Sequence, residues 1–423
     1  MNFFLMFLII LSCILLLWYV KRRATVYSPA NVFTLFWTLQ ILFIVLGWFH
    51  YFDFKYTGIL YMLSLIAVYD IAYVVSFRSI PISSKQKKVI SYREKYCEKI
   101  FLFLLMLYVM FDLYGKIFSG PGLSSLFSIS NLLELSNQNS IERYEDGGDV
   151  GIIGKLTNVN SFLVTILGGM MFHYFKGKKR LLTLVPLAFL MFNGIIAGAK
   201  MGIITGFFLW GIGYMLVLQM MDLNIKINFR VIFYGILGFT GFILFLMLTM
   251  MFRIGHLDLD TFNIVVGKMM SYAFGHLPAF DIWFAKIDHS VENLTWGGKL
   301  LYGITNPLGI LERKQGVYDN LLEISPYDDK TNVFSVFRFF VEDFGVLGSY
   351  LFMTFIGFVT AFVYKHFQKK NDIYMSTTLL CVIYFFISWS FVTSVLAYTS
   401  YIATFVFFYF VIKYFFKVKV LTL

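Results

Sequence analysis

Apolar runs of about 20 residues recur along this chain, and they constrain its fold more than any other feature. As an α-helix, a run of that length crosses the roughly 30 Å hydrocarbon layer of a membrane. Only 14% of the 423 residues are charged, whereas a soluble globular domain has about a quarter charged residues. The sequence therefore predicts an all-α, polytopic integral membrane protein that forms a single membrane domain over residues 1–423.

Basic residues gather in short clusters between the apolar runs, and this pattern predicts the topology. About eleven membrane helices are expected, within a range of roughly 10–13. The expected spans are 2–20, 31–49, 58–77, 100–118, 152–175, 181–198, 201–221, 231–252, 344–364, 373–393 and 396–416. The basic clusters all fall on one side if the N-terminus is outside and the C-terminus is cytoplasmic. The net charge of +11 then reflects the positive-inside rule rather than nucleic-acid binding.

Two long segments lie on the predicted outer side, residues 119–151 and 253–343. The first is a large polar loop in which Arg143 is a candidate substrate contact, although a solvated loop would have the same composition. The second is a large outer loop, long enough to carry function or to fold by itself. Residues 264–285 within it are apolar enough to lie in the membrane interface, so short or re-entrant helices are expected there.

Familiar catalytic motifs are absent from the sequence: there is no Walker A, GxGxxG, HExxH or GxSxG pattern. Asp258 and Asp260 form a D-x-D pair whose carboxylates would share one side of an extended chain and so suit a divalent metal. The alternative is that Asp260 caps a helix beginning near Thr261, with Asp258 solvated. We expect no metal site and no cofactor.

Four residues in or near the outer segments are candidates for chemistry. Lys200 occupies a tight outer turn between two spans, and Arg253 ends the eighth span at its outer side. Each cation suits a phosphate group, or else extends to the lipid headgroups. His276 and Asp281, in YAFGHLPAFDIWF, are candidate general bases. The alternative for the histidine is a packed, hydrogen-bonded side chain.

The segment TNVFSVFRFFVEDFGVLGSYLF, residues 331–352, places charges at the entrance to a membrane helix. Arg338 and Glu342 are four residues apart and can pair on one helix face. A charge at bilayer depth costs at least about 2.5–3.5 kcal/mol, so these groups and Asp343 must lie at the interface, line a wet cavity or pair with other segments. Gly345 and Gly348 permit close approach of another helix.

The same segment resembles a known family. The pattern Asn332-Val-Phe-Ser-x-Phe-Arg338-Phe-Phe-x-x-Asp343-Phe-Gly345-x-x-Gly348 is similar to the entry of a late membrane span in Wzy-type polymerases, which polymerise O-antigen and capsule repeat units. Ala197-Gly-Ala-Lys200-Met-Gly202 resembles the family's small-small-Arg turn, with lysine in place of arginine. Tyr272-Ala-Phe-Gly-His276-Leu-Pro-Ala-Phe280 and Thr295-Trp-Gly-Gly298 resemble its large-loop segment. The resemblance covers roughly residues 190–350.

This resemblance implies a GT-C-like membrane glycosyltransferase of the bacterial cytoplasmic membrane. It would join undecaprenyl-pyrophosphate-linked oligosaccharide repeats on the outer face, with a chain-length regulator and a flippase as possible partners. Cations would stabilise the pyrophosphate leaving group, for which Arg253, Lys200, Arg338 and Arg143 are the candidates. A base would take the acceptor's proton, for which His276, Asp343 and Asp281 are the candidates. We expect the reaction to be metal-independent.

Three other functions remain open. An O-antigen ligase would pass the glycan to a different acceptor. A lipid-linked oligosaccharide flippase is a transporter, a class that tends to show internal repeats and charges near the membrane midplane; here the charges gather in outer loops. A non-catalytic scaffold of a polysaccharide assembly would need neither glycan transfer nor transport of a lipid-linked oligosaccharide.

Overall fold

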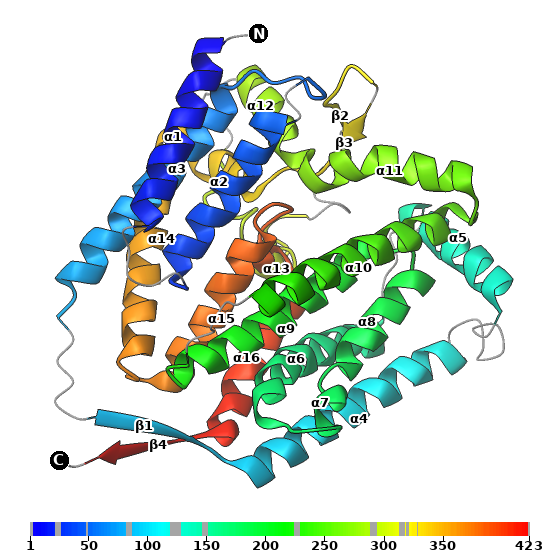
Figure 1. Cartoon of the computed structure of the whole chain (residues 1–423), viewed down its shortest axis with the longest axis vertical. Coiled ribbons are helices and arrows are strands. Elements are labelled where there is room, and N and C mark those ends of the chain that lie inside the picture. The colour runs from blue at the N-terminus through cyan, green and yellow to red at the C-terminus, as the bar shows by residue number, and fades with distance from the viewer. Residues whose placement is uncertain are drawn as a thin grey trace. The chain divides into compact units, whose positions relative to one another are not determined.

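The chain is described by a computed structural model that covers residues 3–21, 27–47, 50–81, 87–118, 128–145, 151–223, 229–287, 294–312, 318, 321–327 and 329–421. Contacts divide the chain into two compact units. Unit 1 comprises Met1–Lys85 and Met270–Ile402, and unit 2 comprises Gln86–Met269 and Ala403–Leu423. The helices and strands are labelled in Figure 1.

Unit 1 contains α1 (Phe3–Lys21), α2 (Pro29–Gly47), α3 (Thr57–Ser79), α12 (His276–Lys286), α13 (Tyr302–Thr305), β2 (Leu322–Glu323), β3 (Lys330–Thr331), α14 (Val336–Gln368), α15 (Ile373–Trp389) and the 3-10 turn η2 (Val395–Ala397). Unit 2 contains β1 (Lys87–Tyr92), α4 (Glu94–Phe118), α5 (Ile129–Glu145), α6 (Ile152–Tyr174), α7 (Lys179–Leu182), α8 (Val185–Ile196), α9 (Lys200–Met220), α10 (Phe229–Ile254) and β4 (Phe416–Leu421). The boundary between the units falls within α11 (Leu259–Phe274) and within α16 (Thr399–Phe415).

Helices long and apolar enough to cross a membrane confirm the polytopic class. Within the described residues there are eight: Phe4–Lys21, Pro29–Gly47, Thr57–Ser79, Ile152–Tyr174, Lys179–Ile196, Lys200–Met220, Phe233–Ile254 and Val336–Gln368. The shorter apolar helices α15 and α16 coincide with the last two predicted spans, and α4 overlaps the span predicted at 100–118. The count of eleven spans stays a prediction.

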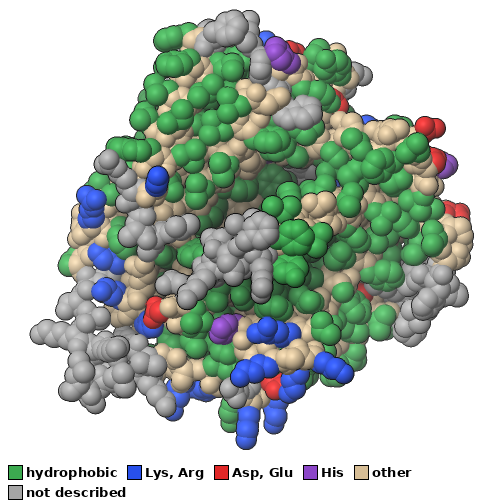
Figure 2. Space-filling model, in the orientation of Figure 1, with side chains coloured by type: hydrophobic (Ala, Val, Ile, Leu, Met, Phe, Trp, Pro, Cys, Tyr) green, Lys and Arg blue, Asp and Glu red, His purple; other side chains and the backbone are tan. Residues whose placement is uncertain are grey.

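Exposed apolar side chains on these helices fit contact with lipid. Phe4, Phe7 and Trp18 of α1 are more than half exposed, as are Tyr234 and Phe239 of α10. Figure 2 also shows hydrophobic side chains spread over much of the drawn surface. Exposed apolar surface on this scale would promote aggregation in water but suits a hydrocarbon solvent.

The core of unit 1 is built where α3 packs along α14, as Figure 1 shows. A side chain at Gly357 would overlap the backbone of Tyr69, so glycine is what lets the two helices touch. The sequence predicted close helix approach at Gly345 and Gly348, and this was wrong. A Cβ at Gly345 would meet only the side chain of Leu294, and one at Gly348 would meet only Phe344 of its own helix.

Gly345 instead breaks α14 into two helical pieces. Its φ of 72° and ψ of 176° are not helical, and a left-handed φ is readily adopted by glycine alone. The first piece begins at Val336, eight residues before the predicted span. This piece therefore carries Arg338, Glu342 and Asp343, and the apolar membrane helix follows the break.

Unit 2 is centred on α6, which packs against α9 and α4. A Cβ at Gly169 would overlap the carbonyl of Trp210, and a Cβ at Gly213 would overlap that of Ile166. Glycines on both helices therefore bring the two backbones into contact, as small residues do between membrane helices.

Two small two-stranded sheets accompany the helices. β1 pairs antiparallel with β4, with Ile90 opposite Val418, and β2 pairs with β3. The β1 sequence, KKVISY, does not alternate, whereas the β4 sequence, FKVKVL, alternates apolar residues with lysines over its first five residues. That period of two favours a strand, but only the basic charge of these segments was used to predict their topology.

Candidate functional site

Arg338 lies at the centre of a cage of aromatic rings in unit 1. Its guanidinium carbon is 3.6 Å from the ring centroid of Tyr318, 4.1 Å from that of Phe334 and 4.8 Å from that of Trp283. Its side chain is only 15% exposed. A cation held over several partly desolvated rings is stabilised by about 1–2 kcal/mol. The arginine is therefore held rigidly.

Glu342 connects Arg338 to two further groups. Its Oε1 accepts a hydrogen bond from Arg338 Nε at 2.8 Å, the i,i+4 pair that the sequence predicted. Its Oε2 accepts bonds of 2.9 Å from Lys299 Nζ and from the Tyr318 hydroxyl. Burial, reinforced by the Glu342 carboxylate, raises the pKa of Tyr318 well above its ordinary value, so this hydroxyl stays a donor. We call Arg338, Glu342, Lys299 and Tyr318 the charged cluster.

The charged cluster retains unused donors. Among the described residues, Nη1 and Nη2 of Arg338 have no hydrogen-bond partner, because the only hydrogen bond of its side chain uses Nε. Arg338, Lys299 and Glu342 carry a net charge of +1 when ionised. A guanidinium that is anchored through Nε presents its two terminal amino groups in the geometry that binds phosphate oxygens.

Asp343 forms its hydrogen bonds to a loop and not to Arg338. Its buried carboxylate accepts hydrogen bonds from the Thr295 hydroxyl, from Lys299 N at 3.0 Å and from Leu300 N at 2.8 Å. In return, Thr295 N and Trp296 N donate to the carbonyls of Glu342 and Asp343, where the break at Gly345 ends the first piece of α14. Asp343 thus fixes residues 295–300 on this helix end, and a catalytic role for it stays a prediction.

Trp296 stands out in this loop because its backbone is strained and its side chain is exposed. Its φ is 50°, which costs a bulky residue about 1–3 kcal/mol. The indole is 77% exposed and borders an open hollow of about 380 Å³ formed by residues 294–311. Such strain persists only where surrounding contacts impose it, and the bonds to Asp343 and Glu342 do so here.

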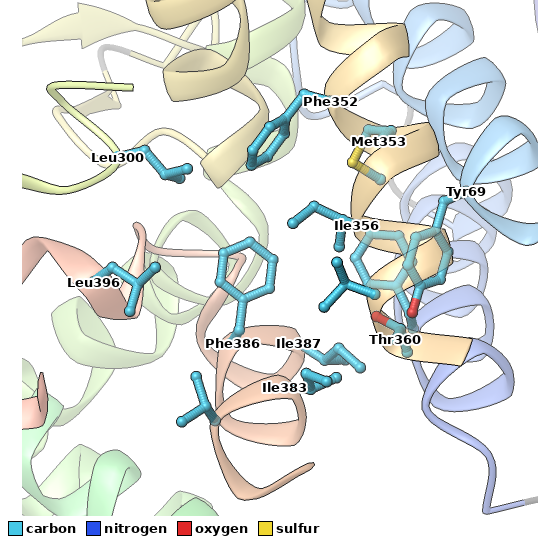
Figure 3. Close-up of a pocket in the computed structure, with 13 residues that line it drawn as sticks. Tyr69, Leu300, Phe352, Met353, Ile356, Thr360, Ile383, Phe386, Ile387 and Leu396 are labelled. Carbon is cyan, nitrogen blue, oxygen red and sulfur yellow. The ribbon is translucent and has the colours of Figure 1, made fainter. Parts of the chain in front are cut away.

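An apolar groove in unit 1 begins at the same loop. Its volume is about 120 Å³, and it is lined mainly by side chains of α14 and α15. Figure 3 shows Leu300 and Phe352 toward one end and Thr360 and Ile383 toward the other. Phe352 and Thr360 are eight residues apart, or about 12 Å along a helix. The groove therefore runs along the part of α14 that follows the break. It begins at Leu300, whose amide donates to the Asp343 carboxylate.

Asp281 of α12 caps the N-terminus of α3. Its carboxylate is fully buried and accepts hydrogen bonds of 2.6–3.3 Å from four backbone amides, those of Lys55, Tyr56, Gly58 and Ile59. These amides lie at the N-terminus of α3, which has no side-chain cap of its own. Burial raises the pKa of Asp281, and the four amides act against that rise. This geometry points to a structural anion at a helix N-terminus.

His276 is buried among aromatic rings. It is 2% exposed, and its ring contacts those of Trp37 and Phe391 edge-on at centroid distances of 5.7 and 5.6 Å. Its Nε2 has no hydrogen-bond partner in the part of the chain that is described. Burial lowers the pKa of His276 to about 3, so the imidazole is neutral. It has no access to a substrate in this arrangement, and its role as a base stays a prediction.

The other predicted cations, Lys200, Arg253 and Arg143, belong to unit 2. Helix α5 contacts the backbone at or near two of them. Asn137 of α5 donates to the carbonyl of Arg253 at 2.9 Å, and Asn139 donates to that of Ile196, just before the Lys200 turn. Lys200 and Arg253 are close enough for their positive charges to act on each other. Arg143 lies one turn beyond Asn139 on α5, and its side chain is outside the described residues.

The D-x-D pair acts as a helix cap. Asp258, rather than the predicted Asp260, accepts a hydrogen bond of 2.7 Å from Thr261 N at the start of α11. This bond lowers the pKa of the Asp258 carboxyl. In the described part of the chain, no group of three or more His, Cys, Asp or Glu side chains is placed to hold a metal ion.

Comparison with known proteins identifies no relative. No protein-family model, no curated protein and no solved structure matches the chain.

The sequence pointed to Arg338 and Asp343 but not to most of their partners. Lys299, Tyr318 and Trp283 reach the charged cluster from segments 20 to 55 residues away, and a local pattern cannot show such contacts. The Thr295–Gly298 motif was the one available sign that this loop matters.

Proposed function

We propose that this protein is a membrane glycosyltransferase that polymerises polyprenyl-pyrophosphate-linked oligosaccharide repeats into a bacterial surface polysaccharide. The proposal rests on one observation: two consecutive residues of a loop belong to the apolar groove and to the charged cluster. Leu300 lines the apolar groove, while Lys299 is paired with Glu342 in the charged cluster. An apolar groove that ends beside fixed cations is complementary to a lipid with an anionic head group. A polyprenyl pyrophosphate is such a lipid.

Arg338 and Lys299 would bind the pyrophosphate. Charge grows on this group as it leaves, and donors fixed in advance at that position lower the barrier. The caged, Nε-anchored guanidinium is such a donor, since neither its position nor its charge needs to change during the reaction. The proposal assigns no step to a metal ion, so we expect a chelator to leave activity unchanged.

The transfer itself is a substitution at the anomeric carbon. A hydroxyl oxygen of the acceptor sugar forms a bond to that carbon of the donor glycan. The bond from the carbon to the pyrophosphate oxygen breaks, and its electron pair leaves with the pyrophosphate. The hydroxyl proton passes to a base of the protein. Glu342 is partly exposed, whereas Asp281 and Asp343 are fully buried, so Glu342 joins His276, Asp343 and Asp281 as a candidate base.

Lys200, Arg253 and Arg143 of unit 2 stay candidates for binding a pyrophosphate group. Asn137 and Asn139 of α5 bind the backbone at Arg253 and at Ile196, just before Lys200, and Arg143 belongs to the same helix. Two nearby positive charges favour an anion of high charge. The predicted topology puts Arg143, Arg253 and the charged cluster on the outer face of the cytoplasmic membrane, with the N-terminus outside and the C-terminus inside.

The deciding experiment uses purified protein in liposomes that contain the lipid-linked repeats of the bacterium from which the gene comes. We expect a ladder of lengthened glycans on the lipid carrier. Transfer to a different acceptor without a ladder would indicate a ligase, and movement across the bilayer without lengthening would indicate a flippase. If none of these activities occurs, a scaffold role replaces the proposal. A chain-length regulator should alter the ladder's distribution but should not be needed for its formation.

A further inference from the structure

The Trp296 loop displays an aromatic side chain where the fold has no packing use for it. Trp296 is 77% exposed. A buried tryptophan contributes to stability through the area it removes from water, and this one removes little. The left-handed φ of 50° adds strain without a packing gain.

The loop is fixed nonetheless. Trp296 N donates to the Asp343 carbonyl at 2.9 Å, and Lys299 N and Leu300 N donate to the Asp343 carboxylate. Gly297, with a φ of 89°, completes the turn in a conformation that favours glycine. The indole is therefore held out on a rigid base, as a preorganised binding group would be.

The hollow beside the indole has the size and lining of a small-molecule site. Its volume of about 380 Å³ lies within the range of roughly 300–1,000 Å³ for ligand pockets. Leu301 and Leu311 are among its lining residues, as are Thr295 and Thr305. Both hydroxyls donate within the protein, to Asp343 and to the Gly298 carbonyl. Their oxygen lone pairs remain able to accept hydrogen bonds from a ligand.

A pyranose ring matches this combination. It has an apolar face of C–H groups, which stacks on a flat ring, and an edge of hydroxyls, which donate and accept hydrogen bonds. We propose that Trp296 is a stacking platform for a sugar ring of the glycan, with Thr295 and Thr305 binding its hydroxyls. This inference rests on the proposed function, because it assigns a sugar subsite beside the cations that would bind the pyrophosphate. The order of residues along the loop then matches the order of groups in the substrate. Trp296 would bind a sugar, Lys299 the pyrophosphate and Leu300 the lipid.

The competing role for an exposed tryptophan in this protein is an anchor in the membrane interface. Trp18 of α1, 52% exposed on an apolar membrane helix, is a matched control for that role. The two roles differ in what reaches the indole. Brominated phospholipids quench an anchor, whereas a soluble oligosaccharide changes the fluorescence of a sugar platform.

The test measures tryptophan fluorescence of the full-length protein in lipid nanodiscs. The Trp296 signal is obtained as the difference between the wild type and Trp296→Phe, and the Trp18 signal from Trp18→Phe. The probe is the oligosaccharide that mild acid releases from the lipid-linked pool of the source bacterium. We expect a saturable change in the Trp296 signal and none in the Trp18 signal, with brominated lipid quenching mainly Trp18. Equal quenching of both tryptophans by brominated lipid, with no response to the oligosaccharide, would overturn the inference.

Kinetics provide a second readout that separates this inference from the proposed function. In the liposome assay, Trp296→Leu should raise KM for the lipid-linked repeat about tenfold with little change in kcat, while Trp296→Phe should retain most of the affinity. An unfolding midpoint like that of the wild type verifies that each variant is folded. If the wild type forms a ladder and Trp296→Leu has an unchanged KM, the sugar platform is wrong and the polymerase stands. If the wild type forms no ladder but the Trp296 signal responds to the oligosaccharide, the polymerase is wrong and the sugar site stands.

Discussion

Replacing Asp343 by asparagine should release the 295–300 loop without unfolding the rest of unit 1. The carboxylate accepts three hydrogen bonds, two at Oδ1 and one at Oδ2. An amide has one oxygen, so in its best orientation it keeps the two bonds at Oδ1 and turns an N–H toward Leu300 N. Loss of one charge-assisted bond and a donor facing a donor together cost about 2–4 kcal/mol. That corresponds to roughly a 30- to 1,000-fold increase in local opening.

Hydrogen–deuterium exchange of peptides from residues 294–301 measures this opening, and Asp281→Asn is the matched control. Asp281 is also a buried carboxylate that binds backbone amides, but its four partners lie at residues 55–59. Asp343→Asn should speed exchange in 294–301 and not in 55–59, and Asp281→Asn should do the reverse. The assignment of Asp343 as a loop anchor fails if its variant leaves 294–301 unchanged, or if both variants affect both segments equally.

Three further predictions concern the buried histidine, the helix break and the groove. Because burial lowers the pKa of His276 from 6.5 to about 3, the unfolded chain binds a proton that the folded chain does not. Stability should then fall as pH drops from 6.5 toward 3, by at most about 1.4 kcal/mol per pH unit, and His276→Phe should remove this part of the pH dependence of the unfolding midpoint. Gly345→Ala should lower the midpoint of thermal unfolding and cost about 1–3 kcal/mol, because φ 72° with ψ 176° is a backbone region that essentially only glycine adopts. Gly241→Ala, in open space within α10, should be neutral or stabilising in the same thermal assay. Ile356→Trp should fill the groove and reduce photocrosslinking to a polyprenyl phosphate probe, while Leu351→Trp, at a position 76% exposed on the same helix, should not; equal crosslinking in both would contradict the lipid assignment.

The sequence was sufficient to predict most helices because membrane spans are recorded locally in apolar composition. The predicted span 58–77 corresponds to α3 at Thr57–Ser79, and 201–221 to α9 at Lys200–Met220. The start of α14 was missed because its charges made residues 336–343 look like a loop. The structure shows that those charges are satisfied by the Arg338–Glu342 pair and by the amides that bind Asp343, and they therefore tolerate a helix.

The site was predictable only where its contacts are close in sequence. Four-residue spacing revealed the Arg338–Glu342 pair, and nothing in the local pattern revealed that Tyr318 and Trp283 would cage the arginine. The same limit explains Asp281. Its sequence neighbourhood suggested a general base beside His276, but its partners lie more than 220 residues away, at the start of α3.

The most direct test of the account is the effect of Arg338→Ala on glycan transfer in liposomes. A single transfer between two lipid-linked repeats, measured with radiolabelled donor, isolates the step that the guanidinium is proposed to assist. Arg180→Ala is the matched control, because Arg180 also combines an Nε hydrogen bond with a ring contact but lies in unit 2 near Phe175 and Phe172. We predict that Arg338→Ala slows transfer by about 100- to 1,000-fold, as loss of a donor to developing charge does elsewhere, and that Arg180→Ala transfers at the wild-type rate. Transfer at the wild-type rate by correctly folded Arg338→Ala would contradict the central claim.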